Sequence, residues 1–117
     1  ANVPYSTVDL RVGTGAEAVT GRRIAVDYTG WLYSASAPDN KGTRFDSSLD
    51  PGKQPFVLIA GGTDAIPGFS QAVVGMRIGG QRRVIIPPSL GYGSQGVPPT
   101  IPGNSTLIFE IELLAIQ

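Results

Sequence analysis

Residues 65–76 form the one segment of this chain whose apolar residues follow a helical period. These apolar residues are spaced three, four and three apart and so share one helical face: Ile66, Phe69, Val73 and Met76. Pro67 suits a first helical turn, where its missing N–H is no loss. Because so short a helix is marginal in water, other parts of the chain must pack against it. The last two of the four apolar residues are therefore expected in the core, whereas the first two could also face a pocket.

The other long apolar runs are typical of β-strands. Six of them are separated by turns rich in Gly and Pro: residues 7–12, 23–33, 43–48, 55–59, 81–86 and 105–116. The first alternates like a half-buried strand, and Gly30 interrupts the second. In the last run, Leu107 to Leu113 alternate so that Glu110 and Glu112 lie on the opposite face. This pattern predicts an α+β, mostly β fold, in which one short α-helix covers one face of an antiparallel sheet.

The length of 117 residues suits a single domain, residues 1–117. Two stretches are expected to be loops. Residues 34–42 are small, polar and rich in turn formers, which favours an exposed loop. Residues 90–104 carry four Gly, three Pro and one aromatic residue, Tyr92. A loop this long is usually functional in a compact domain.

Composition excludes several classes of protein. Nine basic and nine acidic residues give a net charge of zero, which argues against binding to nucleic acid or to an anionic membrane. The chain has no Cys and no His, so it has no thiol nucleophile, no Cys metal site and no Ser-His-Asp triad. No apolar run reaches bilayer length and no coiled-coil heptad occurs, which predicts a soluble monomer. Because the chain begins with Ala1, a cytoplasmic and an exported protein both stay open.

Two polar patterns are better explained by a structural role than by ligand binding or catalysis. Gly61 and Gly62 precede the helix as in a phosphate-binding turn, but no Walker lysine or dinucleotide fingerprint follows. Glu110 and Glu112 could be paired catalytic acids. A solvated sheet face, with Arg82 or Arg83 opposite them, is the simpler explanation.

A set of aromatic and aliphatic residues remains, with one carboxylate beside it. The set is Tyr28, Phe45, Phe56, Ile66, Phe69, Tyr92, Ile101 and Phe109, and the carboxylate is Asp46. Each Phe or Ile taken singly is explained by the core. A buried hydroxyl or carboxylate needs partners, however, and a few polar groups among many apolar ones describe a ligand pocket.

Seven motifs follow one another along the chain at compatible spacing. They are Val26-Asp27-Tyr28-Thr29-Gly30, Phe45-Asp46-Ser47-Ser48, Ile66-Pro67-Gly68-Phe69, Gly79-Gly80-Gln81-Arg82-Arg83, Ile86-Pro87-Pro88, Leu90-Gly91-Tyr92-Gly93 and Thr106-Leu107-Ile108-Phe109-Glu110. Together they resemble the FKBP-type peptidyl-prolyl cis-trans isomerases, the macrolide-binding immunophilins. The match runs from about Thr7 to the C-terminus, which places the core of the domain in residues 6–117.

The resemblance implies a sheet of five or six antiparallel strands wrapped around the short helix, with an apolar pocket between them. It implies a peptidyl-prolyl cis-trans isomerase, or rotamase, that acts in protein folding without a metal or cofactor. Its catalytic residues would be Tyr28, Asp46, Ile66, Phe69, Tyr92 and Phe109. The rest of the pocket would be Phe45, Phe56, Ala65, Val97 and Ile101. Its partners would be proline-containing peptides or unfolded proteins, with macrolides of the FK506 and rapamycin type as inhibitors.

Three departures from the family pattern stand out. The usual tryptophan on the pocket floor is replaced by Phe69, a smaller aromatic residue without an indole N–H. Residues 34–42 are longer than in minimal members, as in a tolerated surface insertion. In the long loop, Thr100 stands where an apolar residue is common.

Three functions stay open at this point. The first is an isomerase of Xaa-Pro bonds, and the second is a non-catalytic module that docks a proline-containing partner in the same pocket. The third is a structural or carbohydrate-binding β domain. It predicts exposed aromatic residues and polar clusters on a sheet face, which the sequence does not suggest.

Overall fold

The computed structural model describes residues 3–117. Its strands are β1 (Ser6–Arg11), β2 (Arg23–Tyr33), β3 (Lys41–Ser47), β4 (Phe56–Ile59), β5 (Gln81–Ile86) and β6 (Leu107–Ile116). The helix is α1 (Pro67–Ala72), and 3-10 turns lie at Pro38–Asn40 and Pro88–Leu90. No helix in this part of the chain has both the length and the apolarity needed to cross a membrane.

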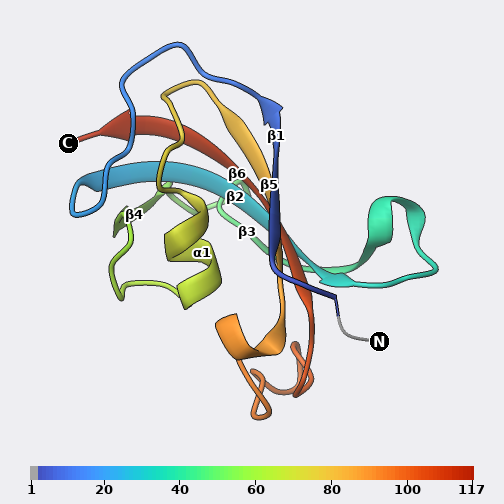
Figure 1. The fold of residues 1–117 in the computed structure, drawn as a ribbon. Helices are drawn as coiled ribbons and strands as arrows, with labels where there is room; N and C mark the ends of the chain where they lie inside the picture. Colours follow the sequence, from blue (N-terminus) through green and yellow to red (C-terminus); the bar gives the residue numbers. More distant parts are fainter. Residues whose placement is uncertain (1–2) are drawn as a thin grey trace.

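The six strands form one antiparallel sheet in the order β1-β5-β6-β2-β3, with β4 paired to β2. Helix α1 lies across the hollow side of the curved sheet (Figure 1). The predicted fold is thereby confirmed. One edge of β2 is shared, because its first half pairs with β4 and its second half with β3. Tyr28 lies at the junction of these two pairings.

Helix α1 is shorter than the sequence predicts, because the chain leaves the helix after Ala72. Gly75 has a φ of 89°, and its N–H donates to the carbonyl of Ala18 at 2.8 Å instead of continuing the helix. Val73 and Met76 are nevertheless buried in the core, as predicted. Arg82 from β5 donates to the carbonyl oxygens of Ala72 and Val74 at 2.8 and 3.0 Å. A side chain from the sheet therefore donates hydrogen bonds to carbonyl groups at the end of a helix that is too short to be stable alone.

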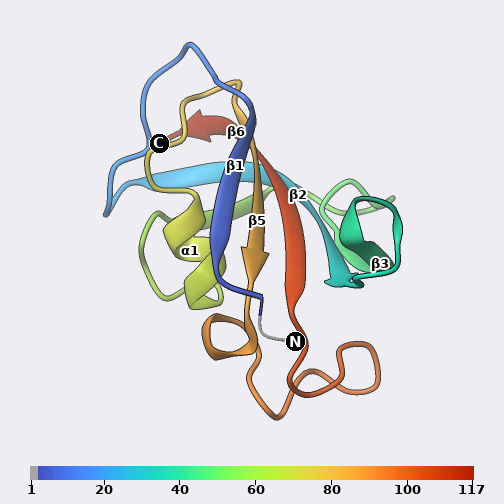
Figure 2. The same ribbon diagram turned by 45° about the vertical axis from the view of Figure 1, so that its right-hand side comes forward.

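Strand β1 is not half-buried, which corrects the prediction from its alternating pattern. All six of its residues are exposed, and Val8 is 56% exposed. The strand lies at the edge of the sheet and pairs only with β5 (Figure 2). Val8 faces Arg83 in the register, on the side of the sheet away from α1. Polar and apolar residues alternate along β1, but both of its faces are exposed to solvent.

Gly30 does not end a strand, because β2 runs through it to Tyr33. A Cβ at this position would lie 2.7 Å from ring atoms of both Phe45 and Phe109, closer than real Cβ contacts come. Two aromatic rings thus occupy the space that a side chain would need.

The face of the sheet away from α1 carries a charged cluster. Glu110 binds Lys41 at 2.8 Å and Arg83 at 3.0 Å, and the Lys41 ammonium lies 4.4 Å from the ring centre of Trp31. Of the two arginines expected opposite Glu110, Arg83 is therefore the partner, while Arg82 points toward α1. Burial alone would raise the pKa of Glu110, but the hydrogen bonds from Lys41 and Arg83 outweigh it and lower the pKa.

This lowered pKa predicts an acid-dependent loss of stability. Because the pKa of Glu110 is lower in the folded than in the unfolded chain, its stabilisation is present at neutral pH and is lost as the pH falls through the folded value. At about pH 7, Glu110→Gln should lower the free energy of unfolding by on the order of 1 kcal/mol. Urea unfolding at a series of decreasing pH values should show this difference between wild type and variant shrinking until Glu110 is protonated in the folded chain as well. A difference that does not shrink would contradict the role, and Glu112→Gln, next to Arg11 at 3.5 Å on the exposed side, is the matched control.

The two predicted loops lie at different ends of the molecule. Residues 34–40 project from the sheet at the far side from α1 and close on themselves, since Ser34 N–H donates to Asn40 O at 2.8 Å (Figures 1 and 2). Residues 41 and 42, also predicted as loop, begin β3. The stretch from 88 to 104 extends beyond the end of α1 (Figure 1).

Candidate active site

A pocket of about 150 Å³ lies between α1 and the hollow face of the sheet. It is lined by Tyr28, Phe45, Asp46, Phe56, Asp64, Ala65, Ile66, Phe69, Tyr92 and Phe109. Nine of the eleven residues that the sequence predicts for the site thus line this one pocket. The chain brings them from six segments: β2, β3, β4, α1 with the loop before it, the 88–104 loop and β6.

The floor and walls of the pocket consist of five aromatic rings in mutual contact. Phe69 lies among them, with ring centres 5.6 Å from Tyr28, 5.9 Å from Phe56 and 5.2 Å from Phe109. Phe45 completes the set at 5.5 Å from Phe109. The contacts are mostly edge to face, the arrangement that aromatic quadrupoles favour. These ring contacts give the pocket its apolar floor and walls.

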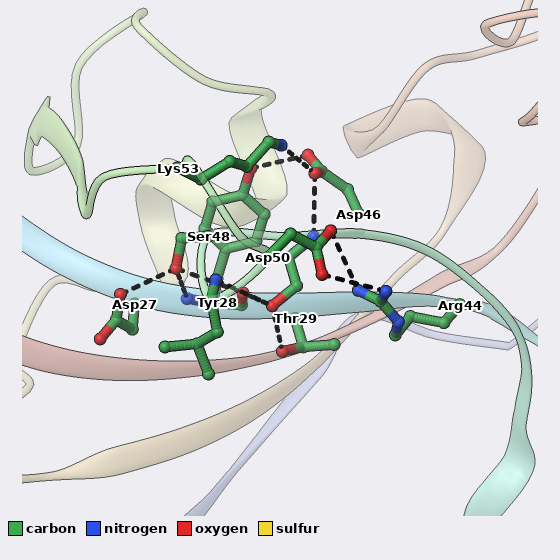
Figure 3. A network of polar contacts seen from close by, with 10 residues as sticks. Asp27, Tyr28, Thr29, Arg44, Asp46, Ser48, Asp50 and Lys53 are labelled. Atoms are coloured by element: carbon green, nitrogen blue, oxygen red, sulfur yellow. Dashed lines mark hydrogen bonds and ion pairs between the residues drawn. The ribbon is translucent and has the colours of Figure 1, made fainter.

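The carboxylate of Asp46 lies at the edge of this apolar surface and has three close partners. The hydroxyl of Tyr28 donates to Asp46 Oδ2 at 2.7 Å, and the Ser47 N–H donates to Oδ1 at 2.8 Å. The ammonium of Lys53 binds the same Oδ1 (Figure 3). Burial acts to raise the pKa of Asp46, but Lys53, Tyr28 and Ser47 together lower it. Asp46 is thus an ionised carboxylate whose contacts orient the Tyr28 hydroxyl and the Lys53 ammonium.

Tyr28 is held at both ends. Burial, followed by its hydrogen bond to the Asp46 carboxylate, raises the pKa of its hydroxyl, so this group stays protonated and donates. Its backbone N–H donates to Ser48 Oγ at 2.9 Å, and its carbonyl accepts from the Ser48 N–H at 2.9 Å. Ser48 Oγ in turn donates to Asp27 at 2.9 Å (Figure 3). Ser48 therefore fixes β2 at the junction where it passes from β4 to β3.

Two donors at the rim have no acceptor within residues 3–117. Ile66 directly precedes α1, and its carbonyl accepts from the N–H groups of Phe69 and Ser70, but its own N–H donates to no acceptor there. The Tyr92 hydroxyl on the 88–104 loop is likewise free of a protein partner in the described part. Burial, and then the charge of Asp46, raise the pKa of Tyr92, which keeps its hydroxyl protonated. Both groups are available to carbonyl oxygens of a ligand.

Two predicted residues, Val97 and Ile101, are not among those that line the pocket. Ile101 is 4% exposed and belongs to the core, and Val97 is 44% exposed. The two are joined by backbone hydrogen bonds of 2.8 and 2.9 Å. This short pairing directs the Ile101 side chain into the core and leaves the Val97 side chain exposed to solvent.

Two residues near the pocket were not predicted. Lys53 lies seven positions after Asp46, just beyond the turn of residues 50–52, and that spacing is the only signal in the sequence. Asp64 lies on the pocket wall, next to Ala65. It could have been found only as a charged neighbour of the Ile66 motif.

A larger depression of about 650 Å³ beside Pro87, Pro88 and Asn104 has no charged or aromatic residue in its lining. Within residues 3–117, no group of three or more His, Cys, Asp or Glu side chains is placed to hold a metal ion.

Comparison with known proteins agrees with this architecture. A sequence model of the FKBP-type peptidyl-prolyl cis-trans isomerase family matches residues 15–114. An FK506-binding protein of Neisseria meningitidis serogroup A is 45% identical over 108 residues, 92% of each chain. The crystal structure of AtFKBP13 has a TM-score of 0.81 at 35% identity and covers 97% of this chain and 93% of its own.

A second crystal structure, a peptidyl-prolyl cis-trans isomerase from Pseudomonas syringae pv. tomato, has a TM-score of 0.77 at 32% identity. It covers 97% of this chain and 75% of its own. The family match spans most of the chain, and the relative from Neisseria is similar over almost the whole length of both proteins. The chain therefore belongs to the FKBP-type peptidyl-prolyl cis-trans isomerase family.

Proposed function

We propose that the aromatic pocket is the active site in which this isomerase accelerates rotation about Xaa-Pro bonds. The observation that carries the proposal is that five aromatic rings, the hydrogen-bonded carboxylate of Asp46 and two donors without a protein partner in residues 3–117 converge on a single pocket. These donors are the Ile66 N–H and the Tyr92 hydroxyl. A proline ring fits such an apolar floor, and the free donors suit the carbonyl oxygens beside it.

The chemistry needs no proton transfer. Rotation about the bond faces a barrier of ~18–20 kcal/mol because amide resonance resists twisting. In the twisted transition state this conjugation is lost and the amide is less polar. An apolar pocket therefore binds the twisted form better than the planar form, and this difference in binding is catalysis.

The polar groups then have distinct roles. The Ile66 N–H and the Tyr92 hydroxyl hold substrate carbonyls, and Asp46 orients Tyr28 without acting as a base. Phe45, Phe56, Ala65, Phe69 and Phe109 shape the wall. Macrolides of the FK506 type would occupy the same pocket, as the names of the relatives suggest for those proteins. Val97 and Ile101 would act only as part of the rim loop.

The natural partners we propose are proline-containing segments of peptides and unfolded proteins. Residues 6–117 would form the core of a single domain, with residues 34–42 as a tolerated surface insertion. The position of this insertion, away from α1, supports that view (Figure 2).

The pH dependence of the reaction tests these roles. The pKa of Asp46 is lowered and those of Tyr28 and Tyr92 are raised, so these three pocket groups keep their charge between about pH 5 and pH 9. We expect kcat/KM to be constant over this range in a cis-trans exchange assay with a short Xaa-Pro peptide. A profile that followed the ionisation of one carboxylate would contradict the absence of acid-base catalysis.

The same assay distinguishes the enzyme from a docking module. Clear acceleration by the wild-type protein supports the enzyme, and Tyr92→Phe should weaken it by removing one carbonyl donor. Macrolide binding without acceleration would instead favour a non-catalytic binding module that uses the same pocket.

A further inference from the structure

Two carboxylates line the pocket, and within residues 3–117 only that of Asp46 has a cation as its partner. Lys53 pairs with Asp46, and Arg44 pairs with Asp50 at 3.0 Å on the neighbouring turn. Asp64 lines the pocket, is exposed, and has no salt bridge or hydrogen bond among residues 3–117. The mouth of the pocket therefore carries an uncompensated negative charge at one place on its wall.

The pocket shares lining residues with two neighbouring hollows, so a bound chain has room beyond the Xaa-Pro pair. One hollow, of about 400 Å³, shares Tyr28 and Phe56 with the pocket. The other, of about 350 Å³, shares Ala65 and is lined by Gly61, Gly62, Thr63, Pro67, Ser70 and Gln71.

Asp64 lies where the pocket meets the second hollow. It precedes Ala65, the residue that both share. A Cβ built on Gly62 would come 3.2 Å from Asp64 Oδ1, so the carboxylate lies beside Gly62, a residue that lines the second hollow. The apolar surfaces of Ala65 and Pro67 beside it suit the hydrocarbon stem of a long side chain.

We propose that Asp64 is a specificity-determining residue that selects substrates with a lysine or arginine beside the Xaa-Pro bond. This inference rests on the proposed active site and adds a charge preference to it. The stem of the basic side chain lies along the second hollow, and its cationic end meets the Asp64 carboxylate. An acidic residue at the same place is repelled by the Asp64 carboxylate, because Lys53 and Arg44 are already paired with Asp46 and Asp50.

The test is a cis-trans exchange assay with a peptide series that differs in one residue. Lys, Gln or Glu is placed first on the amino side and then on the carboxyl side of a constant Xaa-Pro pair. For the wild-type protein at low salt, kcat/KM should favour Lys over Glu by about two- to tenfold at one of the two positions. The ratio should shrink as ionic strength rises, because the charges lie at the surface.

Two variants complete the experiment. Asp64→Asn should bring the Lys-to-Glu ratio close to one. Asp39→Asn removes an exposed carboxylate from the loop at the far side of the sheet and should leave the ratio at the wild-type value. The ratio compares peptides on the same protein, so loss of folded material in either variant does not affect it.

Outcomes for this inference and for the proposed function are separate. Acceleration of all peptides with a Lys-to-Glu ratio near one would overturn the role of Asp64 and leave the isomerase active site intact. A ratio in Asp64→Asn equal to that of the wild type would overturn it as well. If the wild-type protein accelerates no peptide in the series, the proposed active site fails, and the inference with it.

Discussion

Truncation of Phe69 to alanine is expected to lower the free energy of unfolding by about 3–5 kcal/mol. The side chain is 3% exposed and contacts the rings of Tyr28, Phe56 and Phe109. It also anchors α1, a helix of six residues that depends on packing for its existence. Removal of the ring would leave a cavity at the point where helix and sheet meet, and urea unfolding measures the loss.

Val57→Ala provides the control for this variant. Val57 lies on β4 next to Phe56, but it is 45% exposed and faces away from the pocket. Its truncation should change the free energy of unfolding by no more than about 0.5 kcal/mol. A loss of less than about 1 kcal/mol in Phe69→Ala would show that the ring does not hold α1 on the sheet.

The strands were the most predictable part of the fold, because a period of two records which face of a strand is buried. β5 has the predicted bounds of residues 81–86, and β6 begins only two residues later than expected. The same pattern misled for β1, since alternation does not tell an edge strand from a central one. Only the order of the strands shows that β1 is an edge strand, on which Val8 stays exposed to solvent.

The length of the helix could not be predicted from its apolar period. Val73 and Met76 continue the helical spacing, but they reach the core from a turn. The decisive contact is the hydrogen bond from Gly75 to Ala18, which is 57 positions earlier in the chain. Contacts of this kind are invisible to a local pattern.

The apolar part of the pocket was predictable because the resemblance fixed its residues one by one. Its charged surroundings were less so. Lys53 and Asp64 belong to turns outside the quoted motifs, and their positions depend on how those turns fold back on the pocket. Val97 and Ile101 were predicted for the pocket from an altered loop, where Pro98, Pro99 and Thr100 separate them. The paired backbone there directs Ile101 into the core.

Asp46→Ala is expected to reduce kcat/KM for a Xaa-Pro peptide by about ten- to a hundredfold, since hydrogen bonds to a charged group contribute about 1.5–3 kcal/mol. The variant removes the acceptor for the Tyr28 hydroxyl, the Ser47 N–H and the Lys53 ammonium together. The Tyr28 ring would then lose its fixed orientation, and the ammonium of Lys53 would lie unpaired at the pocket.

A double-mutant cycle with Tyr28→Phe separates orientation from general damage. If Asp46 acts by holding Tyr28, its removal should cost less in the Tyr28→Phe background than in the wild type, with a coupling of about 0.5–3 kcal/mol. Asp50→Ala is the matched control, because Asp50 pairs with Arg44 on the next turn and does not line the pocket. Equal losses in Asp46→Ala and Asp50→Ala would contradict the site assignment, since only Asp46 touches both the aromatic wall and its fixed hydroxyl.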